Sequence, residues 1–136
     1  MYTRLGLPGC IGSTDCVHIR LKRCSSGDSV QHKGKEGYPT LFYEVTVNHT
    51  SKIISVTYGI PGTMSDRTIV RFDGFVTDIH DGIIYNNVKF QMCNIIGEEF
   101  EVKGAWLLCD NGYPKWRYMQ CPLKHSAIPR KALWSE

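Results

Sequence analysis

Hydrophobic and polar residues alternate along the first part of the chain. From Thr14 to Leu21, the side chains of Val17, Ile19 and Leu21 share one face, and Cys, His and Arg side chains share the other. Successive side chains of a strand point to opposite faces, so this period of two predicts a β-strand. Residues 22–39, rich in Lys, Ser and Gly, are expected to form a connecting loop.

Four later segments have the composition of strands. Residues 41–48 alternate in the same way, a polar turn follows, and residues 53–60 are rich in β-branched side chains. Two strands joined by a short polar turn predict a β-hairpin. Residues 83–92 and a short return through residues 100–102 are expected to form two more strands around a turn near Gly97.

The clearest helical pattern lies in residues 66–80, where hydrophobic side chains recur at helical spacing. Ser65 is a residue type that caps helix N-termini, whereas Gly74 inside the segment costs about 1 kcal/mol relative to alanine. Residues 105–109 show no alternation, which predicts a central strand buried on both faces. The resulting β-β-β-α-β order predicts an α/β fold with a mixed sheet and at least one crossover.

The composition is that of one folded domain spanning residues 1–136. Hydrophobic residues make up 42% and charged residues 21% of the chain, which excludes a disordered or coiled-coil protein. No apolar run approaches the roughly 20 residues of a membrane span, and the N-terminus lacks a signal peptide. We therefore expect a protein of the nucleus or cytoplasm, not secreted and not bound to membranes, with its six cysteines reduced.

The net charge of +3 is unevenly distributed along the chain. Residues 1–35 and 103–136 each carry +4, and residues 36–102 carry −5. Basic ends could contact a phosphate backbone while the acidic centre binds metal ions. Ordinary solvated surfaces explain the same distribution, and charge alone favours that explanation.

Three aspartates stand at the boundaries of predicted elements. Asp15 opens the first strand, Asp66 begins the helix, and Asp110 ends the central strand. Carboxylates that a rigid scaffold holds open to solvent are suited to bind a divalent cation. Each aspartate also has a structural explanation, as a helix cap for Asp66 and as a turn former for the other two.

Four blocks of sequence surround these aspartates. They contain Gly12-Ser13-Thr14-Asp15, Tyr38-Pro39-Thr40, Gly59-Ile60-Pro61-Gly62 with Ser65-Asp66, and Asp110-Asn111-Gly112-Tyr113-Pro114. In this order the blocks resemble the DDE nuclease domain of Harbinger-type transposases and their domesticated relatives. The resemblance covers nearly the whole chain, and the four blocks together are more specific than any one of them.

The resemblance implies an RNase H-like fold with flanking helices that cuts and joins DNA. Asp15 matches the first catalytic aspartate, Asp110 matches the second, and Asp66 matches a further metal ligand. Two Mg²⁺ or Mn²⁺ ions, about 3.5–4 Å apart, would activate the attacking group and stabilise the leaving oxygen. By this resemblance the protein is a transposase-like hydrolase of phosphodiester bonds that acts in the nucleus.

The chain also departs from the family pattern. A catalytic Glu in an Arg-x-x-Val-Glu-like motif is expected beyond the Gly-Tyr-Pro block, but Glu136 is the only acidic residue after Asp110. The DNA-recognition region is also missing, and Ser65 stands where His is common. We therefore expect a domain incomplete at its C-terminus, inactive alone, that binds DNA weakly through backbone contacts. A DNA-binding partner protein is a candidate for target recognition.

The function of the chain and the role of one aromatic segment each have an alternative interpretation. The chain could be a non-catalytic remnant that acts as a DNA-binding or protein-interaction module. The segment Lys115 to Tyr118, which includes Trp116 and Arg117, could contact a nucleic-acid strand, and packing of its aromatic rings against the sheet explains it equally well.

Overall fold

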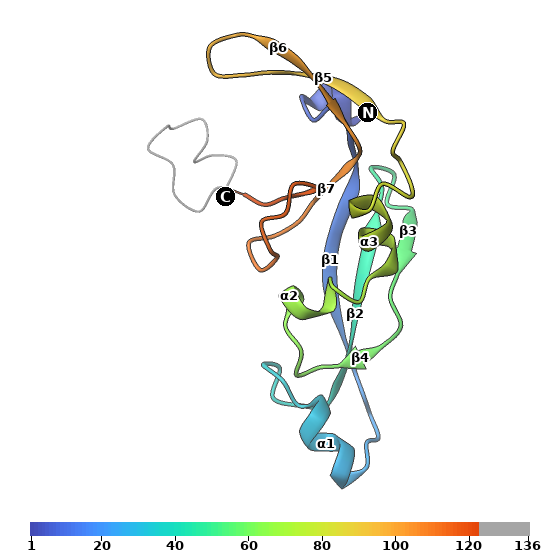
Figure 1. Ribbon diagram of the computed structural model, residues 1–136. Coiled ribbons are helices and arrows are strands. Elements are labelled where there is room, and N and C mark those ends of the chain that lie inside the picture. Colours follow the sequence, from blue (N-terminus) through green and yellow to red (C-terminus); the bar gives the residue numbers. More distant parts are fainter. Residues whose placement is uncertain (123–136) are drawn as a thin grey trace.

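The computed structural model describes residues 1–122, and its main element is a mixed β-sheet with the order β3-β2-β1-β7-β8 (Figure 1). Strands β1, β2 and β3 pair antiparallel, whereas β7 pairs parallel to both β1 and β8. The short strand β4 pairs with β2. The strands are β1 (Cys10–Arg20), β2 (Thr40–Val47), β3 (Ile53–Val56), β4 (Ile60–Pro61), β7 (Trp106–Leu108) and β8 (Met119–Gln120). The predicted α/β class and mixed sheet are therefore confirmed, and the hairpin forms, but the segment predicted as one strand over residues 53–60 is divided into β3 and β4.

The crossover from β4 to β7 contains two helices and a separate two-stranded sheet. These are α2 (Asp66–Ile69), α3 (Gly74–His80), β5 (Lys89–Cys93) and β6 (Glu99–Lys103). In Figure 1 the β5–β6 hairpin lies at one end of the molecule, and helix α1 (Ser26–His32) lies at the other. A 3-10 helix, η1 (Tyr2–Leu5), precedes β1. None of the helices in the described part has the length and apolar content of a membrane span.

Helix α1 corrects the prediction that residues 22–39 form only a loop. The Ser25 hydroxyl accepts a hydrogen bond from the Asp28 N–H at 3.1 Å, which caps the helix. No residue of α1 is buried, and its largest hydrophobic side chain, Val30, is 77% exposed. The helix was missed because it has no hydrophobic stripe for a periodicity analysis to detect.

The single helix predicted over residues 66–80 is also wrong, because the chain breaks it into α2 and α3. Asp73 becomes the N-cap of α3, where its Oδ1 accepts the N–H groups of Phe75 at 2.8 Å and Val76 at 3.3 Å. Gly74, the costly residue inside a continuous helix, then stands at the first position of the second helix. Ser65 does precede α2, but its hydroxyl bonds to the hydroxyl of Thr68.

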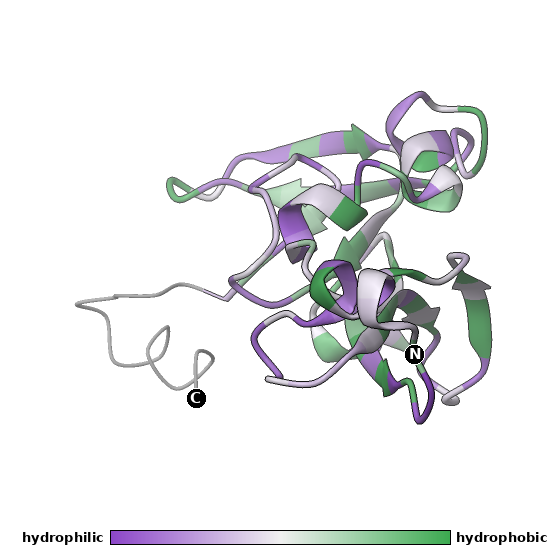
Figure 2. Cartoon of the chain, turned by 90° about the horizontal axis from the view of Figure 1, so that it is seen from below, coloured by the Kyte–Doolittle hydropathy of each residue, from purple (hydrophilic) through white to green (hydrophobic). Residues whose placement is uncertain are grey.

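The core lies between the two short helices and one face of the main sheet. Side chains from α3 and the preceding turn pack on β7 and β8, and α2 packs on β2 and β4. The first cluster contains Val70, Val76, Ile79, Leu107, Cys109, Tyr113 and Met119, and the second contains Phe42, Ile60 and Ile69. The strands themselves alternate between hydrophobic and hydrophilic positions (Figure 2).

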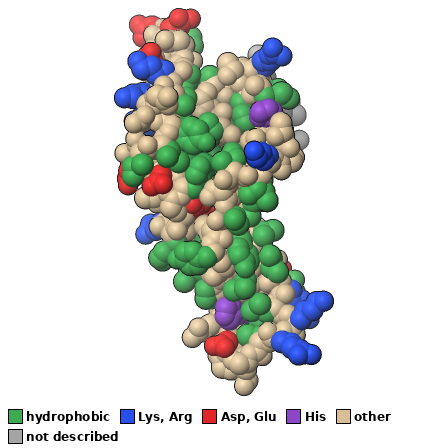
Figure 3. Space-filling view, turned by 90° about the vertical axis from the view of Figure 1, so that its right-hand side faces the viewer, with side chains coloured by type: hydrophobic (Ala, Val, Ile, Leu, Met, Phe, Trp, Pro, Cys, Tyr) green, Lys and Arg blue, Asp and Glu red, His purple; other side chains and the backbone are tan. Residues whose placement is uncertain are grey.

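The covered face of β1 and β2 is the less hydrophobic of their two faces. Thr14 and Glu44 are fully buried on it, whereas Val17 and Ile19 on the other face are 48% and 53% exposed. Figure 3 shows hydrophobic side chains along one side of the molecule. Which face is covered therefore depends on where the crossover packs its helices, and the alternation alone does not indicate it.

Strand β7 was predicted to be central and buried on both faces, but it is an interior strand between β1 and the edge strand β8, and only one of its faces is buried. Leu107 is fully buried, whereas Trp106 and Leu108 on its other face are only half-buried. The strand predicted over residues 83–92 begins only at Lys89, after a series of turns. Strand β8 was missed because two residues are too short to show a period.

Candidate functional site

Asp15 lies on β1, and Asp110 follows β7, the strand that pairs parallel with β1. The parallel register ends at Ser13 of β1 and Leu108 of β7, two residues before each aspartate. On β1, Asp15 shares its face with Val17, which is the face that α2 and α3 leave uncovered, whereas Asp66 stands at the start of α2. Asp15 and Asp110 are both exposed. The carboxyl ends of parallel strands are a common place for ligand sites in open α/β sheets.

Asp66 and Asp110 converge over Gly112. A Cβ atom at residue 112 would lie 2.5 Å from Oδ2 of Asp66 and 2.9 Å from Oδ1 of Asp110. The Gly112 N–H donates a hydrogen bond of 2.7 Å to the same Oδ1, so the turn after β7 also orients the Asp110 carboxylate. Glycine at this position leaves space that two carboxylates from different elements share.

Asp15 does not join this pair closely enough to form a three-residue centre. Its Oδ1 accepts the N–H of Cys16 at 2.8 Å. Within residues 1–122 no group of three or more His, Cys, Asp or Glu side chains stands close enough to hold a metal ion. The structure therefore brings together Asp66 and Asp110 and places Asp15 on the adjacent strand. Glu136 lies outside the described residues.

Glu44 is an acidic residue near this site that the sequence analysis did not single out. It is fully buried, and its Oε1 accepts a hydrogen bond from the Thr14 hydroxyl at 3.1 Å. Its Oε2 has no hydrogen-bond partner within residues 1–122. Burial, and next the charges of Asp73 and Asp66, raise the pKa of Glu44 to about 8, and the hydrogen bond from Thr14 opposes this rise. Glu44 is therefore largely protonated at neutral pH.

One sequence signal could have identified Glu44. It shares its strand face with Phe42 and Thr46, and a hydrophobic residue two positions away on the same face indicates a buried surface. The β1–β2 register pairs Glu44 with Cys16, and Cys16 lies on the same face of β1 as Thr14. Glu44 and Thr14 therefore lie on the same face of the sheet.

Cys16 and Tyr113 connect the site to the core. The sulfur of Cys16 and the phenol oxygen of Tyr113 are 3.0 Å apart, and Tyr113 is only 2% exposed. Burial raises the pKa of Cys16 to about 12, and burial also raises the pKa of Tyr113. Both groups are therefore neutral at physiological pH, and their role is to hold the 110–113 turn against β1.

The fold and the site together define an α/β protein in which two carboxylates, those of Asp66 and Asp110, converge just beyond the end of β7. The chain belongs to the family of plant transposon proteins, whose family model matches residues 2–136. This membership confirms the resemblance to Harbinger-type transposases.

Two relatives match most of the chain. It is 23% identical over 129 residues to "Protein ALP1-like" of Arabidopsis thaliana, an alignment that covers 92% of this chain and 30% of that protein. It is 21% identical over 128 residues to "Putative nuclease HARBI1" of Rattus norvegicus, covering 94% of this chain and 31% of that protein. The chain thus spans about a third of the length of these relatives. No solved structure matches it.

The space over Gly112 leads to a first prediction. In Gly112→Ala the new methyl group would contact Asp66 and Asp110, so the two carboxylates must move apart. We expect Mn²⁺ affinity, measured by calorimetry, to fall about tenfold. The free energy of unfolding should change by less than about 1 kcal/mol, because the ends of flexible side chains can turn away. Gly27→Ala is the control, since a Cβ at Gly27 meets no atom within 4 Å. Equal Mn²⁺ affinity in both variants would contradict the proposed role of the Gly112 space.

Proposed function

We propose that this chain is part of the DNA-cleaving region of a transposase-derived nuclease, in which Asp15, Asp66 and Asp110 hold divalent cations. The observation that carries the proposal is the convergence of the Asp66 and Asp110 carboxylates over Gly112. Family membership supports it, as does the nuclease named among the relatives. The activity of the whole protein is a proposal as well, because the chain covers about a third of the relatives.

The donor set suits Mg²⁺ or Mn²⁺, because both prefer hard carboxylate oxygens. Asp66 and Asp110 fit as a pair of ligands, and Asp15 lies on the neighbouring strand β1. When bound, such a cation activates water and stabilises the oxygen that leaves phosphorus. The chain itself contributes orientation: the Gly112 N–H fixes Asp110, and the buried contact between Tyr113 and Cys16 fixes the turn that carries both residues.

An RNase H-like fold is the finer description that we propose for the sheet. Asp15 lies on the first strand, and Asp110 follows the strand that pairs parallel to it, as the resemblance implies. We also propose that the protein acts on nuclear DNA. In that case the chain binds duplex DNA weakly through phosphate contacts, and its affinity falls steeply as salt concentration rises.

Metal titration of carboxylate variants tests the proposal. We expect Asp110→Asn and Asp66→Asn each to weaken Mn²⁺ binding by at least about tenfold, because each removes a charged ligand. Asp15→Asn should weaken it as well if a third carboxylate completes the site. Glu36→Gln is the control, since Glu36 is exposed and lies far along the chain from the three aspartates. Metal binding that is the same in every variant would refute the proposal.

A second candidate function is a non-catalytic DNA-binding or protein-interaction module. The observation in its favour is that no three metal-binding side chains group together within residues 1–122. The two candidates differ in one measurement, because the module would bind DNA equally well in the wild type and in Asp110→Asn, with no dependence on Mn²⁺.

A further inference from the structure

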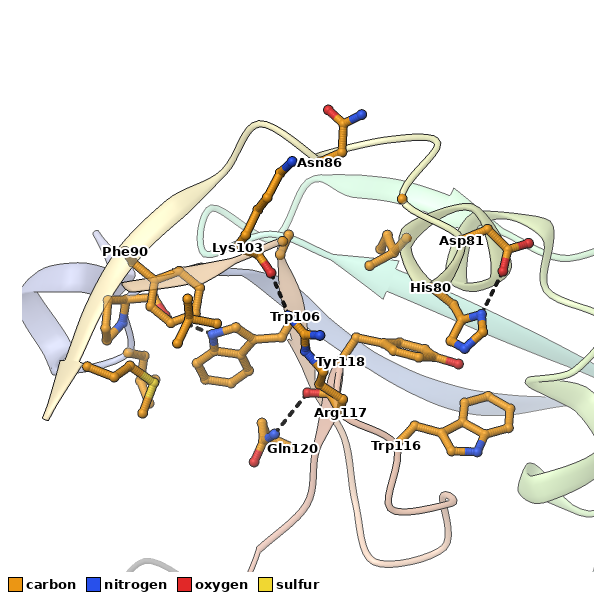
Figure 4. Close-up of a pocket in the computed structure, with 18 of the residues that line it drawn as sticks. His80, Asp81, Asn86, Phe90, Lys103, Trp106, Trp116, Arg117, Tyr118 and Gln120 are labelled. Carbon is orange, nitrogen blue, oxygen red and sulfur yellow. Dashed lines mark hydrogen bonds and ion pairs between the residues drawn. The ribbon is translucent and has the colours of Figure 1, made fainter. Parts of the chain in front are cut away.

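A cavity of about 830 Å³ lies at the opposite end of β7 from Asp110. The end of α3, the β5–β6 hairpin and the segment around β8 surround it, and β7 contributes its first residue, Trp106 (Figure 4). Its volume is within the range of pockets that bind small molecules, about 300–1,000 Å³. None of the three aspartates of the proposed metal site lines this cavity.

Aromatic rings form much of the wall. Phe90, Trp106, Trp116 and Tyr118 line the cavity, and the last three follow one another across Figure 4. The ring centroids of Trp116 and Tyr118 are 5.5 Å apart, and those of His80 and Tyr118 are 4.9 Å apart. The indole N–H of Trp106 donates to the carbonyl oxygen of Pro8 at 2.7 Å, which fixes that ring. The rings are therefore held in place by contacts within the protein.

Two cationic residues, Lys103 and Arg117, also line the cavity, and the amino group of Lys103 lies toward Asn86 at its edge (Figure 4). The Arg117 guanidinium donates to the carbonyl oxygen of Lys103 at 2.8 Å, which holds both residues at the cavity. Neither side chain forms an ion pair with a carboxylate within residues 1–122. Asp81, the acidic residue of the lining, is instead 2.6 Å from the ring nitrogen of His80. The positive charges of Lys103 and Arg117 are thus available to an anionic ligand.

We propose that the aromatic cavity binds an unstacked base of single-stranded DNA, with Lys103 and Arg117 on the adjacent phosphates. Every base has a flat π-face, so aromatic side chains bind bases of any sequence, and cations beside the rings follow the backbone. The amide side chains of Asn86 and Gln120 also line the cavity and can hydrogen-bond to the edge of a base. Burial, and next the charge of Asp81, raises the pKa of Tyr118 to about 12, so its ring is neutral at physiological pH.

The assignment of DNA as the ligand of this cavity rests on the proposed nuclease function, and the position of the cavity agrees with that function. Trp106 and Asp110 are four residues apart along the direction of β7, which corresponds to about 13 Å at a rise of about 3.3 Å per residue. Stacked nucleotides rise about 3.4 Å each along one strand. A strand that is held at Asp110 therefore reaches the cavity after about four nucleotides.

Binding of a short labelled single-stranded oligothymidine to the 136-residue chain tests this proposal, measured by fluorescence anisotropy in EDTA. We expect Tyr118→Leu to weaken binding about tenfold through the loss of stacking, and Tyr58→Leu, a change at a side chain that is 70% exposed, to leave it unchanged. Lys103→Gln should weaken binding severalfold and reduce its salt dependence, whereas Lys115→Gln, an exposed lysine outside the cavity lining, should have a smaller effect.

An abasic oligonucleotide of the same length separates base binding from phosphate binding, and we expect it to compete at least about tenfold more weakly. Equal competition by the abasic strand would overturn the proposal. So would equal affinities of folded Tyr118→Leu and Tyr58→Leu, or displacement by an acidic peptide but not by unlabelled oligothymidine. Asp110→Asn distinguishes this proposal from the nuclease function, because it should lose Mn²⁺ affinity and keep oligothymidine binding in EDTA.

Discussion

The folded chain should lose stability as the pH rises from about 4.5 to about 8, because Glu44 is buried and forms no ion pair within residues 1–122. The unfolded chain releases the Glu44 proton near the ordinary pKa of 4.5, whereas the folded chain keeps that proton up to about 8. Unfolding therefore releases a proton between these values, and higher pH favours the unfolded state. Between pH 4.5 and pH 8 the effect is about 4 kcal/mol, which is a large fraction of the stability of a domain of this size.

Glu44→Gln separates this effect from the titration of other groups. The amide keeps the shape of the protonated carboxyl and an oxygen that can accept the hydrogen bond from Thr14, but it cannot ionise. Urea unfolding of both proteins at a series of pH values should show the variant gaining about 4 kcal/mol relative to wild type between pH 4.5 and pH 8.

The control for Glu44 is Glu36→Gln, the same chemical change at an exposed glutamate. Its stability should follow that of wild type at every pH. Asp73 is the neighbour that raises the Glu44 pKa most, and burial raises its own pKa as well. Titration of Asp73 therefore also lowers the stability as the pH rises, but it does so in both wild type and the Glu44→Gln variant. A stability difference between wild type and Glu44→Gln that does not change with pH would show that Glu44 is not held protonated.

Removal of the Tyr113 ring is the second change with a large expected effect. Tyr113 is 2% exposed and packs in the cluster that contains Leu107 and Met119. Tyr113→Ala should lower the free energy of unfolding by about 3–5 kcal/mol, through lost burial and the cavity that remains. Because the same side chain anchors the turn of Asp110 and Gly112, the variant should also bind Mn²⁺ more weakly.

Two further variants separate the parts of this effect. Tyr113→Phe removes only the contact with the Cys16 sulfur, so it should cost about 1 kcal/mol and keep the turn in place. Tyr58→Ala deletes the same ring at a 70% exposed position and should have little effect. If Tyr113→Ala unfolded at the same urea concentration as Tyr58→Ala, Tyr113 would not be part of the core.

The sequence by itself determined the elements that form through contacts between residues close together along the chain. The β2–β3 turn is one example, because Asn48 Oδ1 accepts the N–H groups of Thr50 at 2.9 Å and Lys52 at 3.0 Å. A polar turn between two alternating segments is therefore sufficient to predict the hairpin. The order of the four blocks likewise indicated the family, and through it the three aspartates as candidate metal ligands.

The tertiary structure alone decided which of these residues meet and which faces are covered. Asp66 and Asp110 belong to distant segments, and only the parallel return of β7 beside β1 brings the second one to the start of α2. The break at Asp73 follows from a cap that competes with helix continuation, which a hydrophobic pattern does not include. Alternation shows that a strand has two faces, but the packing of the crossover helices decides that Glu44 is buried and Val17 is exposed.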